Sequence, residues 1–337
     1  MKFGVFDHLD RCGVPLDEFY DQRLAIVDVY EQMGFHSYHV AEHHGTPLGM
    51  APSPNIFLAA IARRTQRLRF GPLVYLLPLY HPIRLAEEVG MLDQLAKGRL
   101  DVGVGRGRSP IELEYYGCDP SEAEPIFDEA LEILRSGLTE GRVTFSGRHF
   151  TFVDVPVETR PFQLPHPPFW YGIGSLESVD RCVARGFNAV MMAKPARAAQ
   201  IAQRYLECAR ENDRDGLLVG VCRFVVVAGT DEEALAIARR AYPVWHQSFM
   251  HLFDLHGKRP VQSWPSDFDA MMHAGLAFAG SPGSVARAVG QQLADVGANY
   301  CVGQFVFGDM SLDESTRSIE LFGNEVMPAI TGKLAPA

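Results

Sequence analysis

The sequence predicts an α/β fold, a (β/α)8 TIM barrel with two insertions. Short apolar runs alternate with helical segments along most of the chain, and apolar residues lie on both faces of the runs. This pattern is typical of parallel strands that are covered by helices on both sides. About eight strand–helix pairs occur in 337 residues, enough chain for one large barrel. An open doubly wound sheet with extra elements remains the alternative, because counting strands does not distinguish the two folds.

The predicted strands are apolar runs bounded by polar or glycine-rich residues. In chain order they are Phe3–Asp7, Tyr38–Glu42, Leu68–Leu76, Leu100–Gly105, Pro168–Ile173, Asn188–Met192, Leu218–Ala228 and Tyr300–Phe307. The predicted helices carry apolar residues at three- and four-residue spacing. They are Pro15–Met33, Pro54–Thr65, Pro82–Leu95, Ser121–Leu138, Leu176–Arg185, Ala196–Asn212, Asp231–Ala241 and Ser281–Val296.

Two segments interrupt the alternation. Arg142–Pro168, after the fourth strand, is rich in Val, Thr, Phe and Pro, which predicts a hairpin followed by an irregular loop. Tyr242–Ala279, before the eighth strand, contains many aromatic residues. Long insertions in compact domains commonly form lids or binding loops, so this segment is predicted to be lid-like. We therefore expect a single domain over residues 1–337 with two insertions.

Composition excludes several functional classes. The formal charge is −10 and no basic run occurs, which argues against a nucleic-acid partner. No apolar stretch approaches the roughly 20 residues of a membrane helix, so no membrane association is expected. Met1-Lys2 leads directly into the first predicted strand without a signal peptide, and the cysteines form no CxxC pair. These features indicate a cytoplasmic protein.

Glu42-His43-His44 is the most distinctive local feature. It lies at the carboxyl end of the second predicted strand, where barrel enzymes place their active sites. A histidine there can exchange a proton near neutral pH, and a neighbouring carboxylate can fix its tautomer. Alternatively, the histidines only hydrogen-bond the end of the strand. A shared metal ion is disfavoured because adjacent side chains on a strand point to opposite faces, so no metal is expected.

Two other strand ends could bind an anion. Arg106 stands between two glycines after the fourth strand, and a guanidinium suits phosphate. Gly172-Ile173-Gly174-Ser175 begins a helix that contains Ser178, so backbone amides and two hydroxyls could hold an anion. In a closed barrel both sites could share one phosphate. The simpler alternatives are a surface arginine and an ordinary serine cap.

Several motifs together resemble the bacterial luciferase-like flavin monooxygenases. They are Ala41-Glu42-His43-His44, Leu68-Arg69-Phe70-Gly71, Leu77-Pro78, His81-Pro82-Ile83-Arg84-Leu85-Ala86-Glu87, Leu92-Asp93-Gln94-Leu95, Lys97-Gly98-Arg99-Leu100, Gly105-Arg106-Gly107 and Val326-Met327-Pro328. Their order and spacing agree over nearly the whole chain. The resemblance implies a barrel that binds reduced FMN supplied by a separate NAD(P)H:flavin reductase. Such enzymes react the flavin with O2 to give a C4a-peroxyflavin, which oxidises a small organic substrate.

The resemblance also implies roles for particular residues. His43 matches the catalytic histidine, with Glu42 and His44 as its supporting neighbours. The remaining matches concern the cofactor: Arg106, Ser175 and Ser178 fall on phosphate-binding positions, and Leu73-Val74 aligns with a non-prolyl cis peptide beneath the flavin ring. Gly174 departs from the pattern, because luciferase has an acidic residue there, which puts one cofactor contact in doubt.

The resemblance further implies a homodimer formed through the helices Pro54–Thr65 and Pro82–Leu95. The apolar residues expected on these faces are Ile56, Ala59, Ala60, Val89 and Leu92.

An apolar or aromatic substrate is suggested by a predicted pocket of Tyr75, Leu77, Tyr80, Trp245, Phe249 and Phe253. Three alternatives remain: a deazaflavin (F420) hydride-transfer enzyme, a non-catalytic flavin-binding subunit, and, more remotely, a metal-dependent hydrolase.

Overall fold

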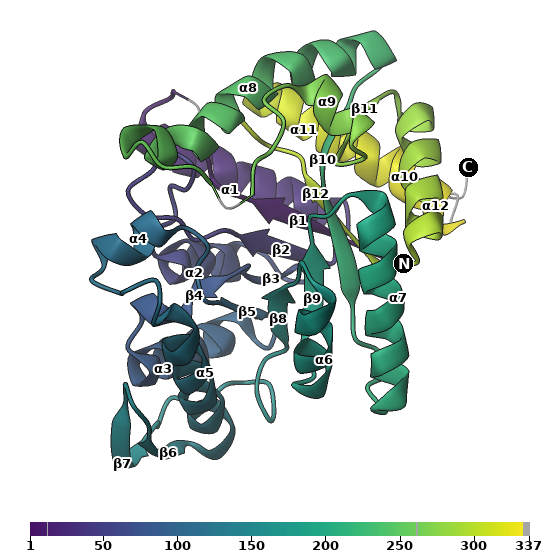
Figure 1. The fold of residues 1–337 in the computed structure, drawn as a ribbon. Coiled ribbons are helices and arrows are strands. Elements are labelled where there is room, and N and C mark those ends of the chain that lie inside the picture. Colours follow the sequence, from purple (N-terminus) through teal and green to yellow (C-terminus); the bar gives the residue numbers. More distant parts are fainter. Residues whose placement is uncertain (12, 261, 333–337) are drawn as a thin grey trace.

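Parallel strands form a barrel-shaped sheet in the computed structural model, which describes residues 1–11, 13–260 and 262–332 (Figure 1). In spatial order the strands are β3 (Arg69–Pro72), β2 (Ser37–Val40), β1 (Lys2–Asp7), β12 (Tyr300–Gln304), β10 (Val219–Val227), β9 (Asn188–Met191), β8 (Phe169–Gly172), β5 (Val102–Gly105) and β4 (Tyr75–Leu76). Every neighbouring pair in this order is parallel.

The sheet closes at the third predicted strand. Only Leu73 and Val74 separate β3 from β4, and the peptide between them is cis. β4 pairs with β5, and an isolated parallel bridge joins Phe70 of β3 to Leu100 just before β5. β3 and β4 are therefore one interrupted strand, and the predicted (β/α)8 barrel is confirmed.

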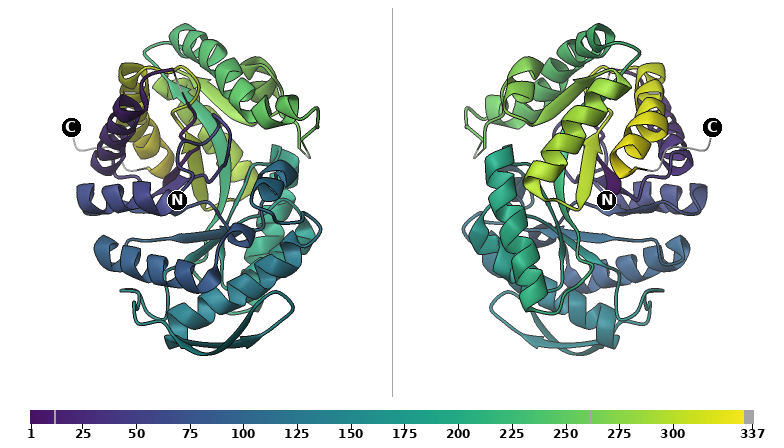
Figure 2. Two further views of the ribbon diagram at one scale, coloured as in Figure 1. Left: turned by 90° about the vertical axis from the view of Figure 1, so that its left-hand side faces the viewer. Right: turned by 90° about the vertical axis from the view of Figure 1, so that its right-hand side faces the viewer.

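Helices surround this barrel (Figure 2). They are α1 (Leu16–Gln32), α2 (Pro54–Arg64), α3 (Pro82–Ala96), α4 (Pro110–Tyr115), α5 (Ala123–Glu140), α6 (Leu176–Ala184), α7 (Pro195–Glu211), α8 (Asp231–Leu255), α9 (Phe268–His273), α10 (Pro282–Val296), α11 (Leu312–Leu321) and α12 (Met327–Thr331), with a 3-10 turn at Leu77–Leu79 and a π-helical turn at Phe322–Val326. None of the helices in these described ranges combines the length and apolar character needed to cross a membrane.

Several apolar clusters stabilise the fold, and two of them lie on opposite sides of the barrel wall. The larger lies between the strands and the surrounding helices. The smaller fills the barrel interior, where Trp170 of β8 contacts both His39 of β2 and Tyr300 of β12, with ring centroids 4.8 and 5.2 Å away. These three strands are not neighbours in the sheet, so their side chains meet across its interior.

The first insertion contains the predicted hairpin, formed by β6 (Arg142–Ser146) and β7 (Thr151–Pro156) as an antiparallel pair. The second differs from its prediction. α8 does not end at Ala241 but continues through Pro243 to Leu255, because Tyr242 and Trp245 remain buried against Phe224 of β10. α9 and β11 (Ala277–Gly280) follow, and β11 pairs in parallel with β10.

One expectation about the dimer faces is wrong. Val89 and Leu92 are 0% and 2% exposed and belong to the main core, so they cannot form a contact face. α3 is amphipathic, and the large apolar residues that it exposes are Met91 and Leu95 instead. On α2, Ile56 is exposed as expected.

Candidate active site

Glu42, His43 and His44 lie in the loop that follows β2, two residues beyond the end of the strand at Val40. The predicted strand was therefore slightly too long at this end. This loop meets α4, a short helix that was not predicted from the sequence. Ser109 caps α4 by accepting a hydrogen bond from the backbone N–H of Glu112, and Pro110 occupies its first turn. α4 thereby presents the Glu112 side chain to the histidine loop.

His43 is held by Glu112. Its Nδ1 is 3.1 Å from Glu112 Oε1, and the same oxygen accepts a 2.7 Å hydrogen bond from the backbone N–H of His44. Burial by itself lowers the pKa of His43, but the charge and hydrogen bond of Glu112 outweigh it, so the pKa lies above its ordinary value. The His43 side chain is 27% exposed, with Nδ1 turned to Glu112 and Nε2 on the opposite side of the ring.

Glu42 and His44 form a second, fully buried pair. His44 Nε2 lies 2.8 Å from Glu42 Oε1, and the Tyr116 hydroxyl lies 2.8 Å from His44 Nδ1. Glu42 also accepts hydrogen bonds from the Leu76 backbone N–H and the Tyr80 hydroxyl. Burial raises the pKa of Glu42, partly offset by these donors. This pair connects the loop after β2 to the end of β4 and to the turn that follows it, so we assign it a supporting position.

His8, directly after β1, adds a second histidine beside His43. The two rings are stacked, with centroids 5.8 Å apart and planes inclined by 21°. Trp245 of α8 places its Nε1 3.4 Å from His8 Nδ1. Burial and the neighbouring His43 lower the pKa of His8 well below its ordinary value. The two adjacent histidines therefore have pKa values shifted in opposite directions, a pattern common where one group holds a proton and the other does not.

Of the predicted substrate pocket, only part lies beside these histidines. Tyr75 and Leu77 are buried in the main core, and Phe253 packs with Ile111 of α4. Trp245 and Phe249 of α8 stack on one another beside His8, with centroids 5.6 Å apart and planes inclined by 12°. α8 and α4 meet here, so the segment predicted to be lid-like supplies an ordered aromatic face.

The cis peptide at Leu73-Val74 is at the position where the resemblance implies one. Gly103 and Gly105 of β5 make room for this segment. A Cβ at Gly103 would stand 2.2 Å from the Pro72 carbonyl oxygen, and one at Gly105 would stand 2.5 Å from Val74 Cγ2. Only glycine permits strands to approach this closely.

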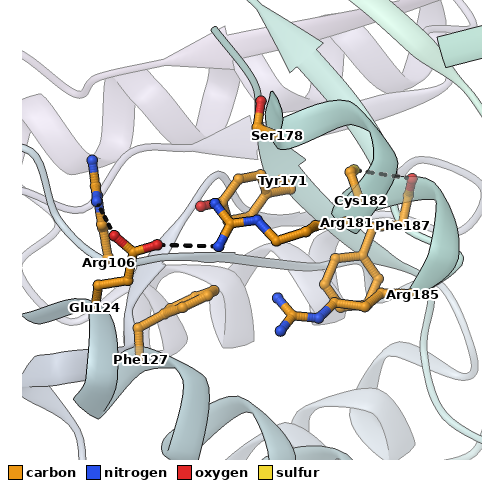
Figure 3. A pocket seen from close by; sticks show the side chains of 9 residues that line it. All are labelled: Arg106, Glu124, Phe127, Tyr171, Ser178, Arg181, Cys182, Arg185 and Phe187. Atoms are coloured by element: carbon orange, nitrogen blue, oxygen red, sulfur yellow. Dashed lines mark hydrogen bonds and ion pairs between the residues drawn. The ribbon is translucent and has the colours of Figure 1, made fainter. Parts of the chain in front are cut away.

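Arg106 and Ser178 line one pocket, together with Glu124, Tyr171 and Arg181 (Figure 3). Glu124 lies between the guanidinium groups of Arg106 and Arg181, at 2.6 and 3.1 Å. Ser175 precedes the first residue of α6 but makes no side-chain cap hydrogen bond, and its carbonyl accepts a 2.7 Å bond from the Ser178 hydroxyl. Arg106 and Ser178 are thus brought to one pocket, whereas Ser175 lies at the adjoining start of α6 and is not part of the pocket lining. Gly174 adjoins them, with open space around a Cβ built there.

Sequence reasoning missed Glu112, Tyr116, Glu124 and Arg181. Two signals could have found some of them. Ser109-Pro110 is a helix-start pattern that places Glu112 in a first turn, and Arg181 follows Ser178 by three residues, on the same helix face. The choice of Glu124 as partner for both arginines depends on the packing of α5 against α6 and has no local signal.

A parallel barrel with a histidine–carboxylate cluster and an arginine-lined pocket, the candidate anion pocket, at the carboxyl ends of its strands defines a TIM-barrel enzyme. Comparison with known proteins identifies its family. The chain belongs to the luciferase-like monooxygenases, whose family profile matches residues 1–300.

Three relatives in sequence illustrate the breadth of this family. The uncharacterised protein y4wF of Sinorhizobium fredii is 37% identical, covering 98% of this chain and 97% of that protein. Limonene 1,2-monooxygenase of Rhodococcus erythropolis is 27% identical, covering 94% of this chain and 82% of that enzyme. The oxygenase component of the flavin-dependent trigonelline monooxygenase of Acinetobacter baylyi is 29% identical, over 56% of this chain and 53% of that protein.

Two solved structures share the fold. Monooxygenase RslO1 of Streptomyces bottropensis superposes with a TM-score of 0.89 at 24% identity, covering 97% of this chain and 99% of that one. The oxygenating constituent of 3,6-diketocamphane monooxygenase of Pseudomonas putida, solved in complex with FMN, has a TM-score of 0.80 at 22% identity and 98% coverage of both chains.

Proposed function

We propose that this protein is an FMN-dependent monooxygenase that uses reduced FMN and O2 to oxidise a small apolar or aromatic compound. The observation that carries the proposal is the order of four strand ends around the barrel. Glu42, His43 and His44 follow β2, Leu73-Val74 joins β3 to β4, Arg106 follows β5 and Ser175 follows β8. These are consecutive positions in the sheet.

This arrangement suits an elongated ligand with one anionic end. Neighbouring strands lie about 4.8 Å apart, so the steps from β2 to β8 span roughly 15 Å along the barrel rim. The proton-handling histidine lies at one end, the anion pocket at the other, and the close-packed cis peptide between them. FMN has a planar ring, a flexible chain and a phosphate in the same order.

The residues at the anionic end fit a phosphate. Arg106 and Arg181 present two guanidinium groups from different elements, and Ser178 adds a hydroxyl in the first turn of α6. Guanidinium forks match phosphate oxygens, and a helix N-terminus favours negative charge. In our proposal Ser175 contributes from the N-terminus of α6, and Leu73-Val74 supports the ring. Gly174 leaves open space beside Ser175 and offers the flavin no side-chain contact.

His43 is the proposed catalytic residue. Reduced FMN would supply two electrons, so that one atom of O2 enters the substrate and the other leaves as water. His43 would exchange a proton through Nε2, because Glu112 holds Nδ1 and raises the pKa of the ring above its ordinary value. Glu42 and His44 would fix the loop that carries it. The stacked Trp245 and Phe249 would hold a planar apolar substrate and limit water near the histidines.

The proposal includes a partner and a location. The related trigonelline enzyme is named as an oxygenase component, which supports a separate NAD(P)H:flavin reductase as the source of reduced FMN. We place this reaction in the cytoplasm and assign the protein a homodimeric state, tested below.

Stopped-flow mixing tests the role of His43. Protein loaded anaerobically with reduced FMN is mixed with oxygenated buffer, and the flavin absorbance is followed. We expect His43→Gln to slow at least one phase by about 100-fold or more, the usual contribution of a general acid or base. His273→Gln, at an exposed position of α9, serves as the matched control. Unchanged phases in His43→Gln would remove this residue from the mechanism.

Two further measurements separate the alternatives. Parallel titrations with FMN and F420 distinguish a monooxygenase from a deazaflavin enzyme of the same fold. Reductase-coupled oxygen consumption, measured over a broad panel of apolar substrates, distinguishes an enzyme from a non-catalytic flavin-binding subunit. Stronger binding of F420, or no consumption above the reductase background, would contradict the proposal.

A further inference from the structure

Glu124 is the unexpected member of the anion pocket. One of its carboxylate oxygens accepts from Arg106 and the other from Arg181, so a single carboxylate bridges two guanidinium groups that come from different elements (Figure 3). Its negative charge lies where a phosphate would bind. A pocket built only to attract anions would not contain a carboxylate at its centre.

The surrounding groups explain why the bridge forms. Arg106 is on the loop after β5, Arg181 is on α6, and Glu124 is in the first turn of α5. The side chains of Arg106, Arg181 and Glu124 are 54, 57 and 43% exposed. Two guanidinium groups this close repel one another unless an anion lies between them. Glu124 provides that anion within the chain.

We propose that Glu124 is an internal substitute for the flavin phosphate. It holds Arg106 and Arg181 in position when no phosphate is bound and releases both when the phosphate enters. The inference rests on the proposed function and extends it in two ways. Arg181 becomes a phosphate ligand beyond those assigned from the sequence, and Glu124 becomes a competitor that keeps the flavin exchangeable.

Charge and exposure favour such an exchange. A phosphate monoester carries between one and a half and two negative charges at neutral pH and three acceptor oxygens, roughly twice the charge of a carboxylate. It therefore satisfies two arginines better than Glu124 does. Because the Glu124 side chain is partly exposed, it can turn into solvent without leaving a buried charge. The arginines are positioned beforehand, so little ordering remains to be done when the ligand binds.

An exchangeable flavin suits an enzyme that receives its reduced cofactor from another protein. Such an enzyme must bind reduced FMN and then release oxidised FMN in every cycle. A competing carboxylate weakens the phosphate contact in both redox states and so favours release.

The experiment measures flavin affinity without turnover. Oxidised FMN and riboflavin are titrated into the full-length protein by flavin fluorescence, and reduced FMN is titrated anaerobically. Riboflavin lacks the phosphate, so it reports contacts to the ring and chain alone. The variants are Glu124→Gln, Arg181→Gln and Arg106→Gln. The matched control is Asp269→Asn, which breaks an ion pair of similar exposure, Asp269–Arg239, between α9 and α8 and outside the residues that line this pocket.

We expect Glu124→Gln to bind FMN about two- to fivefold more tightly, because removing one partly exposed competitor is comparable to removing one exposed ion pair. Arg181→Gln should bind FMN about tenfold or more weakly, since a charge-assisted contact to phosphate is lost. Neither change should alter riboflavin affinity, and Asp269→Asn should behave as wild type.

Several outcomes would overturn the inference. Weaker FMN binding by Glu124→Gln would mean that the carboxylate only positions the arginines. Equal effects on FMN and riboflavin would mean that the substitutions disturb the fold. In another outcome, the wild-type protein binds FMN and Arg106→Gln weakens that binding, but Arg181→Gln and Glu124→Gln do not change it. This outcome would leave the proposed function intact and remove this inference alone. A wild-type protein that bound no FMN in either redox state would contradict both.

Discussion

Glu112 controls the protonation of His43, although it is absent from the histidine motif. Its carboxylate accepts from the ring and raises the pKa of His43 against the opposing effect of burial. We predict that Glu112→Gln lowers this pKa, because an amide keeps a hydrogen-bond acceptor but carries no charge. His43 then loses its proton at lower pH. In the pH profile of the flavin oxidation rate, the limb that reports His43 should move to lower pH.

A matched control lies on the same helix. Glu114 is exposed and paired with Lys258, so Glu114→Gln should leave the profile unchanged. The pH profile also distinguishes a positioning role of Glu112 from a purely structural one, because loss of structure in the variant would lower the rate at every pH without moving the limb. A Glu112→Gln profile with its limb in the wild-type position would show that His43 does not depend on this carboxylate.

At this scale, adjacent residues were predictable and distant partners were not. Glu42-His43-His44 could be singled out because strand ends in a barrel carry the chemistry. Glu112 could not, since its contacts to the histidine loop join residues 68 and 69 positions apart. The sequence contains a candidate helix start at Ser109-Pro110, but only the folded chain determines which side chain that helix turns toward His43.

Among the structural elements, β5 is the most restricted by close packing. Gly103 faces the interruption between β3 and β4, where a Cβ would stand 2.2 Å from the Pro72 carbonyl oxygen and 3.1 Å from Leu73 Cα. We predict that Gly103→Ala lowers the free energy of unfolding by about 3 kcal/mol, at the upper end for overpacking, because the contact is with backbone. Urea denaturation followed by circular dichroism measures this change.

Gly174→Ala is the control for that measurement. Nothing lies within 4 Å of a Cβ built at Gly174, and its backbone is outside the left-handed region. The substitution should change the free energy of unfolding by less than about 0.5 kcal/mol, as is usual at uncrowded surface positions. If both variants had the same stability, the close approach of β5 to the cis-peptide segment would not constrain the fold.

The predicted end of a helix was wrong where a local sequence signal competed with the packing of the folded chain. Pro243 predicts a helix end near Ala241, because proline removes a backbone donor and crowds the preceding turn. The aromatic side chains beyond it favour continuation, since burying Tyr242 and Trp245 against β10 offsets the cost of the proline. β11 escaped prediction because its pairing with the far half of β10 has no local signature.

For the whole molecule, topology was the most predictable property. Parallel strands joined by helices lie beside one another in chain order, with right-handed connections, so an alternating pattern specifies much of the barrel. That order also explains why the phosphate-binding and histidine positions could be predicted to share one rim. The alternation of strands and helices did not indicate that the third strand is interrupted at Leu73-Val74, where the sheet closes.

Exposed apolar residues on two neighbouring helices predict how two copies of the chain associate. Ile56 on α2 is 76% exposed, and Met91 and Leu95 on α3 are 55 and 39% exposed. α2 and α3 pack side by side, so these residues face solvent on adjacent elements. A stable dimer buries about 800 Å² on each partner, more than these side chains alone supply, and the surrounding surface of α2 and α3 must complete the interface.

We predict that Ile56→Lys converts a dimer to a monomer. A lysine at the centre of an apolar interface must lose hydration without gaining a partner, which should raise the dissociation constant by about 100-fold or more. Light scattering coupled to size exclusion at micromolar concentration measures the mass, and Leu255→Lys, at the distant end of α8, is the exposed control. Because Ile56 lies outside the core, the melting temperature of the Ile56→Lys variant should change only through loss of the partner subunit. A wild-type monomer, or dissociation caused equally by both variants, would exclude this face as the interface.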